Sequence, residues 1–546
     1  MGISLFQAIL CGLWYYFCGT CWNFSLGFSV FGRGLVTGTV VGLFMGNPVM
    51  GMVIGANINL IYIGNISAGG AAPSDATAAS ILGTAFAIAN NLSQEVAITI
   101  ALPLGIIFNF RNVFHMTTNA AFAQRLIASA ERGDRRGLFT WQVIAPQCSY
   151  FATGFTTIFL ACYLGADVVG DAMAFLPDWL LKAMNAIGGL MPALGICMNL
   201  RTIGRKETLP FFILGFIMIK YFSNLTVLVI AVFSGIIAYV AVVGTGVHGT
   251  SLDLNLNMES KKEITGSKRL TKKDVNGSFV TWTFFSHSCY NYEIMQAGAF
   301  CLSLAKCLEK LYDGEEFAEA LTRHTAFYNT QPALGGIING IALAMEEEKA
   351  NGGDITGDAV VGLKAGLMGP FAGLGDTLMQ GIITPLFLGI FISMATDSET
   401  LMAPILFTLC NGGVVLFISY YMYHLGYRFG SNAVVMLLDS GIMSLLTNAA
   451  GIVGCMVLGA MSASFVKVQT PLSWVLIEAD PNDPASQAYS INLQADFFDK
   501  LLLGLLPLAS IFTVYALSKR GVRTNTLLIG MVLVGGVLGA LGIISN

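Results

Sequence analysis

Long apolar runs recur along this 546-residue chain, and they restrict its fold more than any other feature. Most of them approach or exceed the roughly 20 residues that an α-helix needs to cross a bilayer. The runs span residues 143–164, 209–243, 382–395, 403–423, 433–460, 501–517 and 526–544. Only 11% of the residues are charged, against about 25% in an ordinary soluble domain. The sequence therefore predicts an all-α polytopic protein that lies in membrane lipid.

The remaining composition excludes several classes of function. Residues 1–19 lack the basic start and small-residue cleavage site of a secretory signal, so we expect a retained membrane helix there. The net charge of −4 gives no sign of nucleic-acid binding. Of the 11 cysteines only Cys18 and Cys21 form a CxxC pair, with no second pair or histidine cluster. We expect the cysteines to pack as small apolar residues, with no metal site and no cofactor.

The distribution of charge predicts the orientation in the membrane. Six lysines and arginines fall within residues 258–274, the most polar part of the chain. Excess basic residues in short loops mark the cytoplasmic side. Residues 478–499 contain acids and no lysine or arginine, so we expect this loop outside.

The basic segment also divides the chain. We predict a membrane domain over residues 1–250, a basic cytoplasmic linker over 251–273, and a second domain over 274–546. The second domain opens with helices of mixed polarity and then returns to the membrane. Met258 followed by Glu-Ser-Lys-Lys is typical of the start of an independent polypeptide. The pattern indicates two membrane subunits joined in one chain.

Residues 364–385, KAGLMGPFAGLGDTLMQGIITP, place Asp376 and Gln380 inside an apolar segment broken by glycine and proline. A carboxylate in such a segment costs about 2.5–3.5 kcal/mol on insertion and is typically functional. Residues 329–353 form another apolar helix, interrupted at its start by Pro332. We expect interrupted or re-entrant helices here, which together bind a solute. The alternative for Asp376 is a helix cap in a re-entrant turn.

Three long motifs, at residues 284–312, 323–352 and 362–386, resemble successive signatures of the IID subunit of mannose-family phosphotransferase systems. Residues 1–250 resemble the companion IIC subunit, best over residues 46–81. The first half departs from the family pattern, which usually has Glu where this chain has Asn59 and Asn where it has Ser67. The family also has Pro where this chain has Ser74. These departures concern the substrate rather than the class of transporter.

The resemblance implies a membrane unit of a phosphoenolpyruvate-dependent sugar phosphotransferase system. Such a unit has two similar, inverted helical halves, works as an elevator-type transporter and assembles as a homotrimer in the bacterial inner membrane. The sugar is held between the halves and is phosphorylated by a separate soluble IIB component, which IIA supplies. The resemblance thus places no catalytic residue on this chain.

Recognition of a sugar requires hydrogen-bonding groups in a dry pocket, with carboxylates as acceptors and amides as partners in both directions. Asp376 and Gln380 are four residues apart, and so share one face of a helix. The candidate residues of the second half are Asn291, Glu293, Gln296, Asn329, Gln331, Asp376 and Gln380. Those of the first half are Asn57, Asn59, Ser67 and Asp75.

Other interpretations stay open for several residues. Asp75 precedes an alanine-rich helix and is equally suited to cap it, and Glu293 and Gln296 suit the polar face of an amphipathic helix. Glu346, Glu347 and Glu348 are most simply a solvated helix end. Lys364 suits an interfacial position. The alternative function is an ion-coupled secondary transporter of a small polar solute, in which Asp75 and Asp376 carry protons or sodium.

Overall fold

The computed structural model describes residues 2–64, 74–174, 177–222, 225–241, 268–430, 442–477 and 489–545. Within them, six helical segments are long and apolar enough to cross a membrane, and a bent pair of helices makes a seventh possible span. The six are Gln94–Glu131, Arg135–Val169, Asp178–Ile203, Gly357–Asp397, Met402–Phe429 and Asn448–Phe465. The predicted polytopic helical membrane protein is confirmed.

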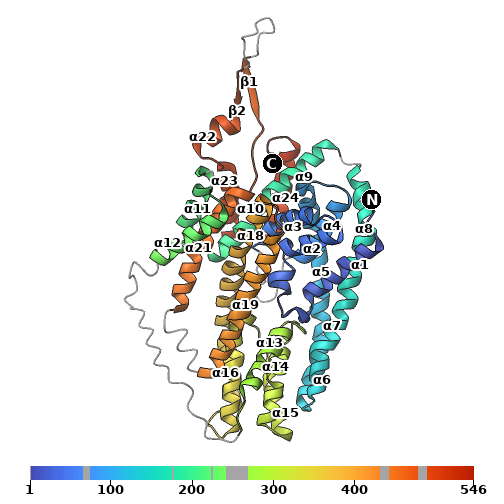
Figure 1. Cartoon of the computed structure of the whole chain (residues 1–546), viewed down its shortest axis with the longest axis vertical. Coiled ribbons are helices and arrows are strands. Elements are labelled where there is room, and N and C mark those ends of the chain that lie inside the picture. The colour runs from blue at the N-terminus through green and yellow to red at the C-terminus, as the bar shows by residue number, and fades with distance from the viewer. Residues whose placement is uncertain are drawn as a thin grey trace.

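The first half contains twelve named α-helices (Figure 1). They are α1 (Leu5–Gly19), α2 (Gly34–Phe44), α3 (Pro48–Tyr62), α4 (Ala76–Ala89), α5 (Gln94–Glu131), α6 (Arg135–Phe139), α7 (Ala145–Tyr150), α8 (Thr156–Ala174), α9 (Asp178–Leu190), α10 (Pro192–Ile203), α11 (Leu209–Tyr221) and α12 (Val227–Tyr239). Short 3-10 and π segments join some of them, namely η1 (Cys21–Asn23), η2 (Gly27–Phe31), η4 (Thr140–Ile144) and η5 (Phe151–Phe155).

Among its described residues, the second half is helical apart from one antiparallel hairpin, in which β1 (Ser473–Ile477) pairs with β2 (Tyr489–Asn492). Its helices are α13 (Lys272–Phe285), α14 (Ala297–Leu311), α15 (Gly314–His324), α16 (Pro332–Ala350), α17 (Gly357–Gly375), α18 (Thr384–Asp397), α19 (Met402–Phe429), α21 (Ile442–Phe465), α22 (Asp499–Leu501), α23 (Leu505–Lys519) and α24 (Thr524–Ala540), with π segments η7 (Asp376–Ile383) and η8 (Gln494–Phe498).

Glycines bring the membrane helices into close contact. A Cβ on Gly38 of α2 would lie 2.4 Å from the carbonyl oxygen of Gly51 and 2.5 Å from Cα of Gly55, both in α3. A Cβ on Gly215 of α11 would lie 1.9 Å from the carbonyl oxygen of Met456 in α21. Small residues at such crossings let helix backbones approach in lipid, where packing rather than water drives association. The second contact fastens the two halves together.

The halves are interlocked rather than merely adjacent. Helices α11 and α12 of the first half pack against α21 of the second, α9 packs against α24, and α10 packs against α23 (Figure 1). One apolar core draws on both halves, with Ile58 and Phe212 from the first and Phe407 and Met456 from the second. The two halves therefore form one scaffold.

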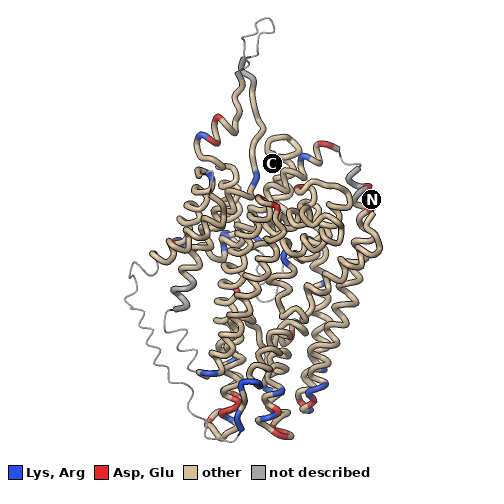
Figure 2. Tube along the Cα trace, viewed as in Figure 1, with Lys and Arg blue, Asp and Glu red and all other residues tan. Residues whose placement is uncertain are grey.

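Charge separates the two ends of the molecule. Figure 2 shows acidic and basic residues gathered at the end that carries α6, α15 and the foot of α16, whereas the β1–β2 hairpin rises from the opposite end. Lys268 lies at the charged end, where its Nζ donates to the carbonyl oxygen of Leu311 at 2.7 Å. Most of the predicted linker and residues 478–488 lie outside the described residues. The described residues that flank the linker and those that flank residues 478–488 lie at opposite ends of the molecule, as the predicted orientation requires.

The expected break at residues 364–385 is absent from the described structure. Helix continues from Gly357 to Asp397 through the π segment η7. Pro385 has no N–H to donate and its ring would crowd the carbonyl of residue Gly381 in a regular α-helix. The wider π turn accommodates this proline without ending the helix. The prediction of a re-entrant turn here was wrong because sequence alone did not distinguish a π segment from a break.

Candidate functional site

A cavity of about 390 Å³ lies between the two halves. The first half lines it with residues between Tyr15 and Arg33, the start of α4 and the middle of α5. The second half lines it with the end of α13 and the connection that follows, the start of α16, η7 and the middle of α19. Ligand pockets in proteins commonly measure about 300–1,000 Å³. The cavity therefore has the size of a small-molecule site.

Six of the eleven predicted site residues line this cavity, namely Asp75, Gln296, Asn329, Gln331, Asp376 and Gln380. Ser67 lies outside the described residues. The remaining four, Asn57, Asn59, Asn291 and Glu293, are not part of the lining.

The two asparagines of α3 serve helix packing. Asn57 Nδ2 donates to the carbonyl oxygen of Val53 at 2.9 Å and to Gln94 Oε1 at 3.1 Å. Asn59 is 2% exposed, and its Oδ1 accepts from the Leu35 N–H at 3.4 Å, across the contact between α2 and α3. In this structure both side chains bond within the scaffold of the first half.

Asn291 and Glu293 organise the connection beside the cavity. Asn291 Oδ1 accepts from the N–H groups of Glu293 at 2.9 Å and Ile294 at 3.0 Å, which is the pattern of an Asx turn. Glu293 accepts a hydrogen bond from Gln124 Nε2 of α5. These contacts fix the path of the chain between α13 and α14 against the first half.

Asp75 caps a helix, which is one of the two interpretations that the sequence left open, and it also lines the cavity. Its Oδ1 accepts from the Ala78 N–H at 2.9 Å, at the start of α4. Its Oδ2 accepts from the Tyr15 hydroxyl and lies 3.6 Å from Arg111 Nη2. The Arg111 guanidinium lies over the rings of Tyr15 and Tyr150, at 5.0 and 4.7 Å. Asp75 is thus neutralised by its neighbours.

Asp376 begins the π segment, and its Oδ1 accepts from Gln380 Nε2 at 2.7 Å. The predicted four-residue spacing does bring these two side chains together. The helix is continuous at this point, so Asp376 has no free helix start to cap. Gln331 does cap a helix, since its Oε1 accepts from the Leu334 N–H at 2.9 Å.

Amide and aromatic groups of the second half complete this wall. Gln296 Oε1 accepts from the Thr330 N–H at 3.0 Å, and its Nε2 lies 3.3 Å from Nε2 of His287. Asn329 Oδ1 accepts from the Tyr290 hydroxyl at 2.9 Å. The segment before α14 and the segment before α16 are therefore bonded into one surface.

Several cavity residues were missed from the sequence, namely Tyr15, Arg33, Arg111, His115, Tyr150, His287 and Tyr290. Arg33 and Arg111 both stand within apolar segments. The signal that selected Asp376, an ionisable residue in an apolar run, applies equally to them. The histidines and tyrosines carried no comparable signal, because neither a motif nor a spacing set them apart.

A second group of buried charges lies at the charged end, away from the cavity. Glu346 is 0% exposed and accepts from the Tyr312 hydroxyl at 2.7 Å. The same carboxylate lies 3.0 Å from His324 Nε2 and 3.1 Å from Arg323 Nε. The prediction of a solvated helix end was wrong for Glu346 and for Glu347, which is also buried.

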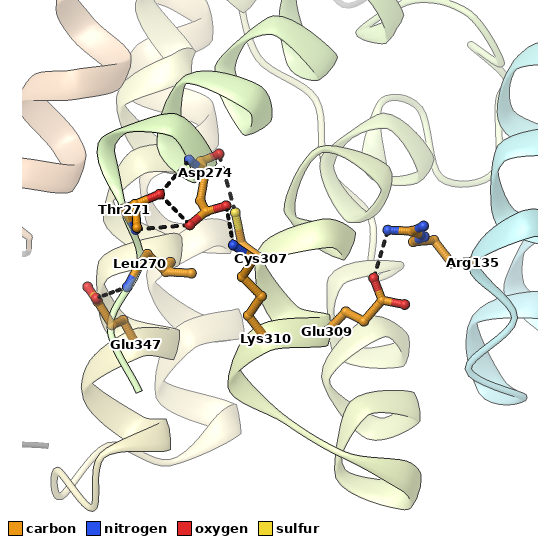
Figure 3. Close-up of polar contacts among 8 residues, drawn as sticks. All are labelled: Arg135, Leu270, Thr271, Asp274, Cys307, Glu309, Lys310 and Glu347. Atoms are coloured by element: carbon orange, nitrogen blue, oxygen red, sulfur yellow. Dashed lines mark hydrogen bonds and ion pairs between the residues drawn. The ribbon is translucent and has the colours of Figure 1, made fainter. Parts of the chain in front are cut away.

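Figure 3 shows how this region is fastened to the start of α13. Glu347 accepts from the Leu270 N–H at 2.8 Å, and Asp274 Oδ1 lies 2.6 Å from Lys310 Nζ. Lys364 is buried nearby, and its Nζ donates to the carbonyl oxygen of His324 at 3.2 Å. The interfacial position predicted for Lys364 was therefore wrong.

Among the described residues, no group of three or more His, Cys, Asp or Glu side chains could hold a metal ion. All eleven cysteines are free. Cys18 and Cys21 of the CxxC pair are buried and line the cavity.

Two family models match separate parts of the chain. The model of the PTS system mannose/fructose/sorbose family IID component matches residues 269–544. The model of the PTS system sorbose-specific IIC component matches residues 5–240.

Individual relatives show the same division. The PTS system mannose-specific EIID component of Escherichia coli (strain K12) is 33% identical over 280 residues, which cover 51% of this chain and 96% of that protein. The PTS system sorbose-specific EIIC component of Klebsiella pneumoniae is 28% identical over 185 residues, which cover 34% of this chain and 70% of that protein. A solved membrane protein chain is 34% identical, covers 51% of this chain and 100% of its own length, and has a TM-score of 0.46.

Proposed function

Because this chain belongs to the mannose/fructose/sorbose family of phosphotransferase-system membrane components, with an IIC-like and an IID-like half, we propose that it carries its sugar in the cavity between those halves. The chain is the membrane sugar-translocating unit of such a system, and a separate IIB component phosphorylates the sugar. One observation carries the assignment of the site: both halves contribute polar side chains to one cavity.

The site recognises hydroxyl groups. Asp376 is an acceptor whose side chain is held by Gln380, and Gln331 and Asn329 add amide groups that both donate and accept. A sugar hydroxyl that donates to a carboxylate makes a charge-assisted hydrogen bond, which is stronger than a bond between neutral groups. The buried wall formed by Gln296 and His287 fixes this surface before the sugar arrives.

We propose that the sugar reaches the cytoplasmic side by an elevator-type motion of one part of each half, and that the halves are inverted copies of one fold. Transporters of this kind bind substrate near the midplane, between related halves. The proposal extends to a homotrimer in the bacterial inner membrane, with IIA and IIB as soluble partners. The family membership supports these points, and cross-linking between copies would test the trimer.

Reconstituted vesicles that contain this chain test the function. With phosphoenolpyruvate and the full set of soluble components, phosphorylated sugar should accumulate, and omission of IIB should abolish uptake. Labelled phosphate should appear on the soluble components and on the sugar. Stable label on His324 or another histidine of this chain would contradict the proposal.

The same vesicles distinguish the alternative. An ion-coupled transporter would deliver unmodified solute, and an uncoupler would abolish its uptake. Asp75 is already engaged by Arg111, Tyr15 and Ala78, which disfavours it as a carrier of protons. Uptake of free sugar that stops with an uncoupler and persists without IIB would favour the alternative.

A further inference from the structure

Arg33 is a buried cation that lines the cavity. The residue is 7% exposed and stands immediately before the first residue of α2. Its guanidinium carbon lies 4.8 Å from the centre of the Phe28 ring. Its Nε has no hydrogen-bond partner, and no ion pair joins its side chain to an acid among the described residues.

Burying such a cation is unfavourable in free energy. A buried guanidinium without a carboxylate loses the solvation of its charge and gains little in return. The ring of Phe28 provides a cation–π contact, which stabilises the charge only in part. Arginine also presents planar donors that match a carboxylate in a bidentate way. The position thus provides half of an ion pair inside a ligand cavity.

The other charges of the cavity do not complete this pair. Asp75 is engaged by Arg111, Tyr15 and the start of α4, so the positive charge of Arg111 is neutralised within the first half. Asp376 belongs to the lining contributed by the second half, where its bonded partner is Gln380, and it forms no ion pair with Arg33. The two walls therefore differ in sign: the first half offers an unneutralised cation, and the second half offers a carboxylate for hydroxyl groups.

The backbone around Arg33 strengthens the preference for an anion. Arg33 precedes an 11-residue helix whose N-terminal N–H groups form the positive end of a dipole. The Arg33 side chain does not cap this end, and Asn59 Oδ1 accepts from the N–H of Leu35, the second residue of α2, at 3.4 Å. The preceding residue, Gly32, accepts a hydrogen bond from Thr77 Oγ1 at 3.1 Å, which holds the start of α2 against the start of α4.

We propose that the sugar carried by this chain bears a carboxylate, which pairs with Arg33 while its hydroxyl groups bind the wall that holds Asp376. The inference rests on the proposed function and adds the class of substrate to it. An aldonate, with the carboxylate at C1, keeps a terminal hydroxymethyl group free to accept the phosphoryl group. A hexuronate has its carboxylate in place of that group. We therefore assign the aldonate arrangement.

The test uses the purified full chain in lipid nanodiscs and matched probes that differ in one group. D-gluconate is compared with D-glucitol, and D-mannonate with D-mannitol, by calorimetry. A hydrogen bond to a charged group is stronger than one to a neutral group, so the acid should bind about tenfold more tightly than the polyol. D-glucose and D-mannose serve as neutral sugars.

Variants of Arg33 locate the effect. Arg33→Gln should abolish the preference, so that each acid binds no more tightly than its matched polyol, whereas Arg33→Lys should keep part of the preference. Arg132→Gln, at an exposed arginine that ends α5, is the matched control and should keep the full preference.

The outcomes separate the two proposals. If the wild-type chain binds neutral sugars and shows no preference for the acids, the proposal of a substrate carboxylate fails and the proposed sugar site stands. An equal loss of both probe classes in Arg33→Gln would show a structural arginine and would also overturn the proposal of a substrate carboxylate. If neither class binds, the cavity is not the sugar site and both proposals fail. Should Arg33→Gln not fold, the wild-type preference and Arg33→Lys still decide the question.

Discussion

The buried charges of this protein fall into two regions that are arranged in opposite ways. At the charged end, Glu346 lies among Tyr312, Arg323 and His324, all within 3.1 Å. In the cavity, Arg33 has no acidic partner among the described residues, and Asp376 is held by an amide. Both regions place charges in apolar surroundings. The charged end surrounds Glu346 with partners, whereas the cavity pairs Asp75 with Arg111 and leaves Arg33 without an acid.

The difference indicates which charges stabilise the fold and which are kept for a ligand. Two buried charges that neutralise each other are not available to a solute. Removing one of them should therefore lower the stability of the fold. A buried charge without a partner destabilises the unliganded protein, and it becomes paired only when a ligand binds. Substitutions in the two regions should therefore separate stability from transport.

The largest effect is expected at Glu346. Glu346→Gln leaves Arg323 as a buried cation without its anion, which should lower the free energy of unfolding by about 3 kcal/mol. Thermal unfolding of the purified chain in nanodiscs measures this loss. Glu348→Gln, two residues along the same helix at an exposed position, is the control and should unfold as the wild type does. Equal losses in the two variants would contradict the comparison.

The second effect concerns transport rather than stability. Asp376→Asn keeps an acceptor but removes the charge, so uptake of every substrate should fall about tenfold, with the assembled protein still present. Asp397→Asn, at the exposed end of the same helix, should transport normally. Normal uptake by Asp376→Asn would show that this carboxylate does not contact the sugar.

Asn59 tests the boundary of the site. Asn59→Leu removes the acceptor of the Leu35 N–H between α2 and α3, and should lower the free energy of unfolding by about 1 kcal/mol. The ranking of sugars in competition assays should not change, because Asn59 does not line the cavity. A changed ranking would mean that Asn59 reaches the sugar at another stage of transport.

The smallest effect is expected at Asp274. Burial raises the pKa of this carboxyl, but the hydrogen bonds from Lys310 and Thr271 lower it by a larger amount. The resulting pKa is about 2, below the ordinary 3.8. The carboxylate therefore stabilises the fold above pH 4, and this contribution is lost as the pH falls toward 2. Asp274→Asn should lower the free energy of unfolding by about 0.5 kcal/mol at neutral pH.

The pH dependence provides the check on Asp274. Unfolding of the wild type and of Asp274→Asn by denaturant should converge as the pH falls from 4 to 2, since both then lack the charge. Asp313→Asn, which removes a carboxylate outside this contact, should show no such convergence. A constant difference between wild type and Asp274→Asn would assign the effect to packing.

Part of the candidate site could be predicted, and the reason is local. Asp376 and Gln380 were found because an acid in an apolar helix is conspicuous and because four residues make about one helical turn. Gln331 followed from the proline that begins α16. Asn57 and Asn59 met the same local criteria, yet their helix presents them to α2 and Gln94 instead of the cavity.

By itself, the sequence determined that the chain spans a membrane in two joined halves, since apolar length and the placement of charge are properties of the chain. Its long motifs also determined the family. Only the tertiary structure decided which polar groups come together: it buried Glu346 among its partners, brought Arg33 and Asp376 to one cavity, and turned an expected break into a π segment. Burial and pairing depend on helices distant in the sequence, and local pattern carries no information about which helix will cover a given face.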